Sequence, residues 1–155
     1  MNSMAYKNYL LLFWLVFSVS SCFVNEEKYT EIVLCNLRKD NIDIELYTHI
    51  VIIPNVGCGG CISEAEHFFQ ENKEENILFV FTKVRSLKEL RLRHGKKLER
   101  KNVLVDKQQR YASEKEEINI YPIIIDIREK GRCKWDFLEP GVSYQDILKN
   151  KVIEK

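Results

Sequence analysis

Two cysteines three residues apart, Cys58 and Cys61, stand at the junction between a predicted strand and a predicted helix. Residues 50–53 form a continuous β-branched run that ends at Pro54, which is typical of a strand buried on both faces. The stretch from about residue 61 to 72 predicts a helix, because its apolar residues recur at helical spacing: Ile62, Ala65, Phe68 and Phe69. The sequence therefore predicts that Cys58 lies just before a helix, in the loop by which the chain leaves a sheet.

The rest of the chain predicts further strands and helices of one α/β domain. A capping box at residues 86–89 starts a helix in the middle of the chain, and residues 143–152 predict a last helix. The stretches 29–37 and 42–47 alternate loosely and predict a pair of N-terminal strands. Four more apolar segments predict strands: 77–81, 103–105, 123–127 and 133–138. This order predicts a mixed central sheet with helices on both faces, formed by residues 29–155.

Residues 1–21 have the pattern of an export signal. A weakly basic start precedes a short apolar run at 10–19, which is too short to span a bilayer comfortably. The Val-Ser-Ser-Cys sequence that ends at Cys22 resembles the bacterial lipobox, in which the cysteine is acylated and becomes the mature N-terminus. This resemblance implies a lipid-anchored domain outside the cytoplasm, facing the periplasm or the cell surface, with residues 22–28 as a tether. An uncleaved anchor or an ordinary signal peptide are the alternatives.

Two segments of the predicted domain resemble the thioredoxin superfamily. The Gly-Cys-Gly-Gly-Cys sequence at 57–61 resembles its active site, and Tyr121-Pro122 opens a later strand, as the active-site proline of that family does. The strand, aspartate and charged turn at 123–131 resemble membrane-tethered thiol–disulfide oxidoreductases of the cytochrome-maturation type. The resemblance spans about residues 49–149. It implies a thioredoxin-like fold and a cis peptide bond before Pro122, with the proline facing the CxxC.

The chemistry expected of the CxxC follows from the positions of its two sulfur atoms. A thiolate is the nucleophile, whereas a free thiol with a pKa of ~8.5 is mostly protonated near neutral pH. A helix N-terminus favours the thiolate at Cys58, and Cys61, one turn further and more buried, is expected to resolve a mixed disulfide. The family resemblance implies that Pro122 shapes the substrate groove. Glu64 is the nearest candidate acid for proton transfer, but its position favours the alternative interpretation, a first-turn acid that complements the helix dipole.

These features predict thiol–disulfide exchange with an extracytoplasmic protein partner, for which the dithiol itself carries the electrons and no cofactor is needed. The alternative is a redox-inactive lipoprotein of the same fold that binds or scaffolds a partner. The net charge of +1 and the export signal disfavour nucleic acid as a partner. Val56-Gly57 stands where the family has tryptophan, and Gly60 replaces a common proline, so the direction of exchange is left open.

Three further groups each have two interpretations. The CxxC is half of a zinc site, but no second CxxC completes it, and no metal is expected. Cys35 and Cys133 lie in predicted strands and are either buried small hydrophobes or partners in a second disulfide. The stretch 83–101 is rich in lysine and arginine and forms either a solvated helix face or a contact with anionic lipid near the anchor.

Overall fold

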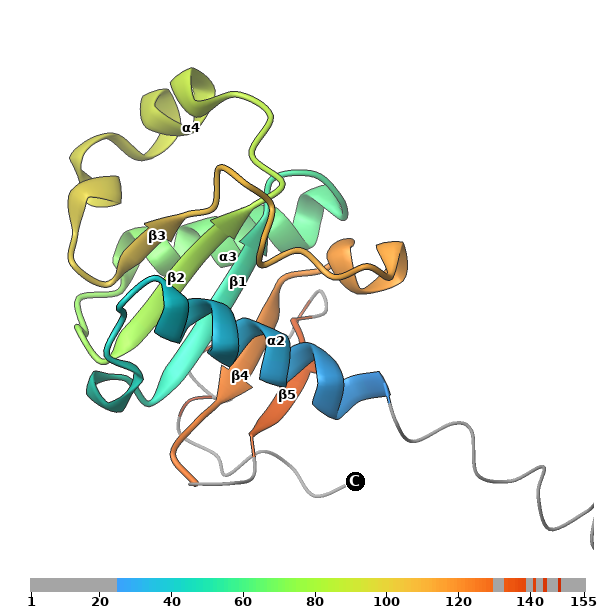
Figure 1. Ribbon diagram of the computed structural model, residues 1–155. Coiled ribbons are helices and arrows are strands. Elements are labelled where there is room, and N and C mark those ends of the chain that lie inside the picture. The colour runs from blue at the N-terminus through green and yellow to red at the C-terminus, as the bar shows by residue number, and fades with distance from the viewer. Residues whose placement is uncertain (1–24, 130–132, 139–140, 142–143, 145–147, 149–155) are drawn as a thin grey trace, which may run out of the picture.

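A mixed five-stranded sheet is the centre of the fold in the part of the chain that the structure describes (Figure 1). The structure is a computed structural model that describes residues 25–129, 133–138, 141, 144 and 148. The strand order is β3-β2-β1-β4-β5, in which β1, β2 and β3 are parallel and β4 is antiparallel to both β1 and β5. The strands are β1 (His49–Pro54), β2 (Ile77–Thr82), β3 (Val103–Val105), β4 (Ile123–Asp126) and β5 (Lys134–Phe137). The predicted α/β class and mixed sheet are therefore confirmed.

Helices cover both faces of this sheet. On one face lie α3 (Gly59–Glu71) and α4 (Leu87–His94), whose apolar residues share a core cluster with Val51, Phe79 and Phe81. On the other face lies α2 (Asn25–Lys39), which packs on Ile50, Ile52 and their neighbours (Figure 1). Three short 3-10 helices complete the order: η1 (Ile44–Leu46), η2 (Gly95–Glu99) and η3 (Glu116–Asn119). Because both faces are covered, every residue of β1 and β2 is buried, as their continuous apolar sequences predict.

The predicted pair of N-terminal strands is wrong. Residues 29–37 lie inside helix α2, and residues 42–47 contain the 3-10 helix η1. Tyr29, Val33 and Leu37 are buried, and their spacing of four residues is helical rather than alternating. Helix α2 begins at Asn25, so it takes in the last part of the stretch 22–28 that the sequence predicts as a tether.

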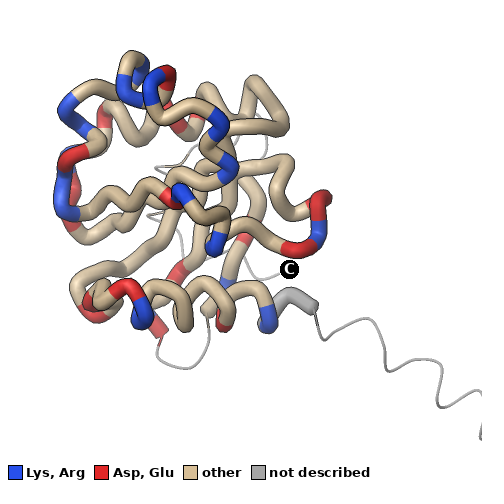
Figure 2. Tube along the Cα trace, turned by 45° about the horizontal axis from the view of Figure 1, so that its top comes forward, with Lys and Arg blue, Asp and Glu red and all other residues tan. Residues whose placement is uncertain are grey.

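The middle of the chain agrees with its sequence signals. Ser86 caps α4, and its Oγ accepts the Glu89 backbone N–H at 3.3 Å, as the capping box predicts. Helix α4 ends at His94, and the next residue is Gly95, whose φ of +56° suits glycine. The basic stretch 83–101 forms α4, η2 and the turns beside them, and Figure 2 shows its lysines and arginines gathered along that side of the molecule.

Parts of the predicted C-terminal region lie outside the described residues. They include the hairpin turn at 130–132 and most of the last helix predicted at 143–152. Tyr144 and Leu148, which are described, pack against the core cluster of α3, and the Tyr144 ring stacks on Phe68 at 4.6 Å between centroids.

A buried carboxylate, that of Asp106, stabilises the loop that follows β3 through three hydrogen bonds. It accepts the Thr82 hydroxyl at 2.9 Å, the Arg110 N–H at 3.0 Å and the Tyr111 N–H at 2.9 Å. The Tyr111 hydroxyl in turn donates to Asp40 at the end of α2, at 2.6 Å. This loop therefore links β2 to α2 and sets the course of the chain toward η3.

Replacing Asp106 by asparagine is expected to lower the free energy of unfolding by about 2 kcal/mol, because the amide NH₂ replaces one acceptor and leaves buried donors unpaired. Urea denaturation of the wild type and the variant measures this. Asp43→Asn is the matched control. Asp43 is exposed and caps η1 by accepting the Glu45 N–H, and asparagine caps a helix equally well. An equal loss of unfolding free energy in the two variants would contradict the role of Asp106 as the acceptor that holds this loop.

Candidate functional site

The CxxC forms a disulfide at the N-terminus of α3. Cys58 and Cys61 are bonded, with their Cα atoms 5.4 Å apart. Cys58 is the N-cap residue of the helix, in an extended conformation, and its Sγ accepts the Cys61 backbone N–H at 3.4 Å. The Cys58 sulfur therefore lies at the positive end of the helix dipole, as the sequence predicts.

The two sulfur-bearing residues differ in exposure. Cys58 is half-buried and its neighbours Gly59 and Gly60 are exposed, whereas Cys61 has no exposed surface. A partner can thus approach Cys58 but not Cys61. The predicted difference in burial between the two cysteines is confirmed.

The loop before the disulfide packs closely against the segment that leads into β4. The Cys58 N–H donates to the Ile120 carbonyl oxygen at 2.9 Å. Gly57 has a φ of +154°, and a Cβ added there would lie 2.1 Å from that same oxygen. Glycine is therefore required at position 57 by conformation and by space. Sequence reasoning misses both contacts, because a backbone carbonyl oxygen carries no sequence signal and nothing in the sequence shows which segment packs against Gly57.

Pro122 is two residues beyond Ile120, so the chain that leads into this proline lies beside the CxxC loop. That Pro122 itself faces the disulfide stays a prediction. The predicted cis bond is wrong: there is no cis peptide bond among the described residues, which include Tyr121 and Pro122. Pro122 is buried, and its carbonyl oxygen accepts the Leu138 N–H at 2.8 Å, which continues the pairing of β4 with β5. The proline thus opens β4 in a trans conformation while Ile120 makes the contact to Cys58.

Glu64 is exposed on α3. Within the described part of the chain, it makes no contact with the disulfide. The helix begins at Gly59, so Glu64 lies in the second turn, and the first turn of this described helix contains no acid. The interpretation as a first-turn acid is therefore wrong. Its charge does act on Tyr144: burial chiefly, and Glu64 in addition, raise the pKa of that phenol.

Two hydrogen bonds and an ion pair hold η3 and Ile120 in place. Asn119 is buried and closes the loop before it, accepting the Ser113 N–H and donating to the Ser113 oxygen, both at 2.7 Å. Lys83, at the end of β2, forms an ion pair with Glu116 at 2.7 Å. These contacts join η3 to the end of the sheet from which the CxxC emerges.

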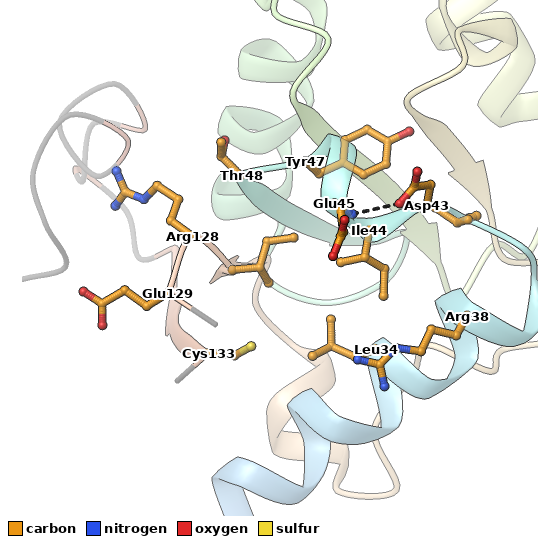
Figure 3. A pocket seen from close by; sticks show the side chains of 12 residues that line it. Leu34, Arg38, Asp43, Ile44, Glu45, Tyr47, Thr48, Arg128, Glu129 and Cys133 are labelled. Atoms are coloured by element: carbon orange, nitrogen blue, oxygen red, sulfur yellow. Dashed lines mark hydrogen bonds between the residues drawn. The ribbon is translucent and has the colours of Figure 1, made fainter. Parts of the chain in front are cut away.

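The other two described cysteines are free thiols away from this site. Cys35 is exposed on α2, so the predictions that it lies in a strand and is buried are wrong, and it forms no disulfide with Cys133. Cys133 immediately precedes β5 and lines a pocket of about 800 Å³ with Leu34, Arg38 and Arg128, among others (Figure 3). Burial, assisted by the charge of Asp126, raises the pKa of the Cys133 thiol. The pocket also includes Thr48, which precedes β1, so it lies at the opposite end of the sheet from Cys58.

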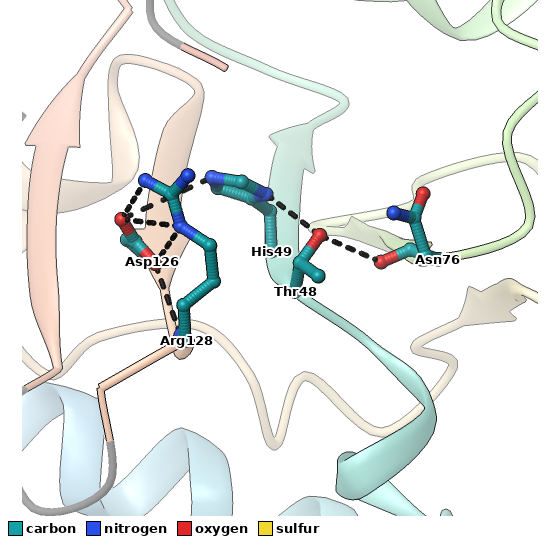
Figure 4. A network of polar contacts seen from close by, with 5 residues as sticks. All are labelled: Thr48, His49, Asn76, Asp126 and Arg128. Carbon is teal, nitrogen blue, oxygen red and sulfur yellow. Dashed lines mark hydrogen bonds and ion pairs between the residues drawn. The ribbon is translucent and has the colours of Figure 1, made fainter. Parts of the chain in front are cut away.

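A polar network occupies that opposite end (Figure 4). His49 is buried, its Nδ1 lies 2.9 Å from the Thr48 hydroxyl, and its Nε2 lies 4.0 Å from Asp126. Asp126 is held by the guanidinium of Arg128, with Nε at 3.0 Å from Oδ1. Burial lowers the pKa of His49, although the charge of Asp126 opposes this.

The free energy of unfolding is expected to fall as the pH drops from 7 to 5, because the unfolded chain protonates His49 near its ordinary pKa of 6.5 while the folded protein resists that proton. Urea denaturation at several pH values measures the slope. His49→Gln should flatten it, whereas His67→Gln, at an exposed position on α3, should leave it unchanged. An identical slope in wild type and His49→Gln would refute the prediction.

The described residues bring together no group of three or more histidine, cysteine or acidic side chains that could hold a metal ion.

Cys22 and the predicted signal lie outside the described residues, and within those residues no helix is long and apolar enough to cross a membrane. Comparison with known proteins finds no family model, no curated protein and no solved structure that matches this chain. Function must therefore be argued from the site.

Proposed function

We propose that the protein exchanges disulfides with a protein partner through Cys58 and Cys61. The observation that carries this proposal is the asymmetry of the disulfide. Cys58 is half-buried at the N-terminus of α3, and Cys61 behind it is fully buried. A partner thiolate reaches Cys58 only, and a thiolate left on Cys58 is favoured by the helix dipole.

Exchange proceeds in two balanced steps. A partner thiolate attacks the Cys58 sulfur, a partner–Cys58 disulfide forms, and the Cys58–Cys61 bond breaks to leave a Cys61 thiolate that takes up a proton. A second partner thiolate then attacks the partner sulfur of the mixed disulfide. The partner then contains a disulfide. Cys58 and Cys61 remain in the protein as thiols, having received two electrons and two protons. The reverse sequence oxidises the dithiol and reduces the partner.

The domain is proposed to be thioredoxin-like and lipid-anchored outside the cytoplasm. The proposal of fold family is supported by a CxxC between β1 and α3, and by the segment that leads through Pro122 into β4, whose Ile120 contacts the CxxC loop. The proposal of an anchor rests on the lipobox-like sequence that ends at Cys22. A compartment outside the cytoplasm also tolerates the disulfide.

Equilibration with mixtures of reduced and oxidised glutathione tests the proposal. After quenching with an alkylating reagent, mass spectrometry reports the fraction of Cys58–Cys61 that is reduced. We expect a reversible two-electron transition between about −270 and −120 mV, the range of known exchange proteins. Cys35 and Cys133 provide internal markers of thiols outside the site.

A disulfide that remains oxidised to potentials below about −300 mV would be structural, and would support the redox-inactive scaffold instead.

A further inference from the structure

The charges of this protein are unevenly distributed. The stretch 83–101 contains nine lysines and arginines and two glutamates, whereas the whole chain has a net charge of +1. The remainder of the chain is therefore net negative. Figure 2 shows the basic residues of this stretch lying over α4 and η2.

Some of these basic residues hold α4 and η2 against α3. Arg93 pairs with Glu66 at 2.9 Å, Lys97 donates to the Gln70 carbonyl at 2.6 Å, and Arg100 donates to the Asn72 carbonyl at 3.1 Å. They satisfy acceptors along and at the end of α3, so their positions have a structural explanation.

A second set has no such explanation. These residues are exposed, and their side chains have neither a hydrogen bond nor an ion pair among the described residues: Arg85, Lys88, Arg91 and Lys96. They lie within seven positions of Leu92 along the chain, and Leu92 is a large apolar side chain of α4 that is 77% exposed. We call Leu92 and these four residues the basic face. Exposed cations without an ion-pair partner, on one short segment with an exposed leucine, are typical of a binding surface.

The basic face begins at the end of the sheet that carries the disulfide. The Asn55 N–H donates to the Thr82 carbonyl at 2.9 Å, so the chain after β2 starts beside the chain that leads to Cys58. Lys83 follows directly and pairs with Glu116 of η3, and Arg85 is two residues further. A partner that covers Cys58 is thus within reach of the first cations of the basic face.

The basic face lies away from the proposed anchor. Helix α2, which joins the anchor, packs on the opposite face of the sheet from α4, and Figures 1 and 2 both place the two helices on opposite sides. Two residues lie between Cys22 and Asn25, the first residue of α2, so the chain spans about 11 Å at most between them. The membrane that holds the proposed anchor is therefore poorly placed to contact the basic face.

We propose that the basic face docks an acidic surface of the protein partner that exchanges disulfides at Cys58. This inference rests on the proposed function and specifies the partner: its cysteines are flanked by aspartate and glutamate. Opposite charge raises the rate of encounter and selects among partners, and salt screens both effects.

Three reduced dithiol peptides with acidic, neutral or basic flanks provide the test. The oxidised full chain, in neutral detergent, is mixed with each, and the rate of Cys58–Cys61 reduction is measured by quenching and mass spectrometry. Each rate is divided by the rate at which the same peptide reduces hydroxyethyl disulfide, which removes differences in thiol reactivity. We expect the acidic peptide to react about tenfold faster than the basic one at low salt, and the difference to vanish at high salt.

Charge reversal at the basic face is the decisive variant. Arg85→Glu, Lys88→Glu and Arg91→Glu together should abolish the preference for the acidic peptide and leave the rate with uncharged dithiothreitol unchanged. The matched control reverses three exposed lysines elsewhere, Lys28, Lys39 and Lys134, with the same change in net charge, and should keep the preference.

Two results would overturn the docking proposal. Equal normalised rates with the acidic and basic peptides would do so while leaving disulfide exchange intact, because dithiothreitol still reports exchange. Protection of Arg91 from trypsin when the anchored chain is placed in phosphatidylglycerol vesicles, but not in neutral vesicles, would assign the basic face to anionic lipid instead. No reaction with dithiothreitol would count against the proposed function, and binding of the acidic peptide with serine in place of cysteine would then report on docking alone.

Discussion

Replacing Cys58 by serine is expected to slow disulfide exchange with a peptide substrate by at least about a thousandfold. The serine hydroxyl is not ionised near neutral pH, and Cys61, the remaining sulfur of the pair, has no exposed surface from which to attack. The rate at which the reduced protein cleaves a peptide disulfide, followed by mass spectrometry, measures the effect. Because the variant cannot form the Cys58–Cys61 bond, its folding is compared with that of the reduced wild type.

Two further substitutions separate the roles of the cysteines. Cys61→Ser keeps the attacking sulfur, so a mixed disulfide at Cys58 should accumulate instead of resolving. Cys35→Ser removes an exposed thiol on α2 and should leave the rate unchanged. A Cys58→Ser protein that exchanges disulfides at the wild-type rate would show that the reaction takes place elsewhere.

Replacing Gly57 by alanine is expected to lower the free energy of unfolding by about 3 kcal/mol or more. The backbone φ of +154° strains any side chain, and the new Cβ would lie 2.1 Å from the Ile120 carbonyl oxygen. Either the CxxC loop or the segment before β4 must shift, and the hydrogen bond from Cys58 N–H to that oxygen is lost. Urea denaturation of the oxidised proteins measures the change.

Gly59→Ala is the matched control, one residue beyond Cys58. A Cβ at this position meets nothing within 4 Å, and Gly59 is the first residue of α3. Alanine there should leave stability unchanged or raise it by up to about 1 kcal/mol. If Gly57→Ala were as stable as Gly59→Ala, the close packing of the CxxC loop on Ile120 would be wrong.

The core of the fold could be predicted because its strands carry unambiguous local signals. Residues 50–53 and 77–81 are continuous apolar runs, and both are central, fully buried strands. Residues 29–37 were harder, because alternation and helical spacing overlap in this stretch. Its buried apolar residues, Tyr29, Val33 and Leu37, are four apart, and the helix that they indicate packs on the sheet.

The candidate site was predictable to the extent that it depends on side chains. The order of strand, CxxC and helix placed Cys58 at a helix N-terminus and Cys61 inside it. Two features could not be predicted from the residues. The contact that brings η3 to the CxxC is made by the backbone of Ile120, and the residues around Pro122 do not specify whether the bond before it is cis or trans.

Alkylation of the reduced, folded protein is the most direct test of the claim that Cys58 is the reactive sulfur. A short pulse of iodoacetamide near neutral pH, followed by peptide mapping, gives the rate at each cysteine. We expect Cys58 to react first, faster than the exposed thiol of Cys35, and Cys61 to remain protected until the protein is unfolded. A Cys58 that reacts more slowly than Cys35, or no faster than Cys61, would contradict the account.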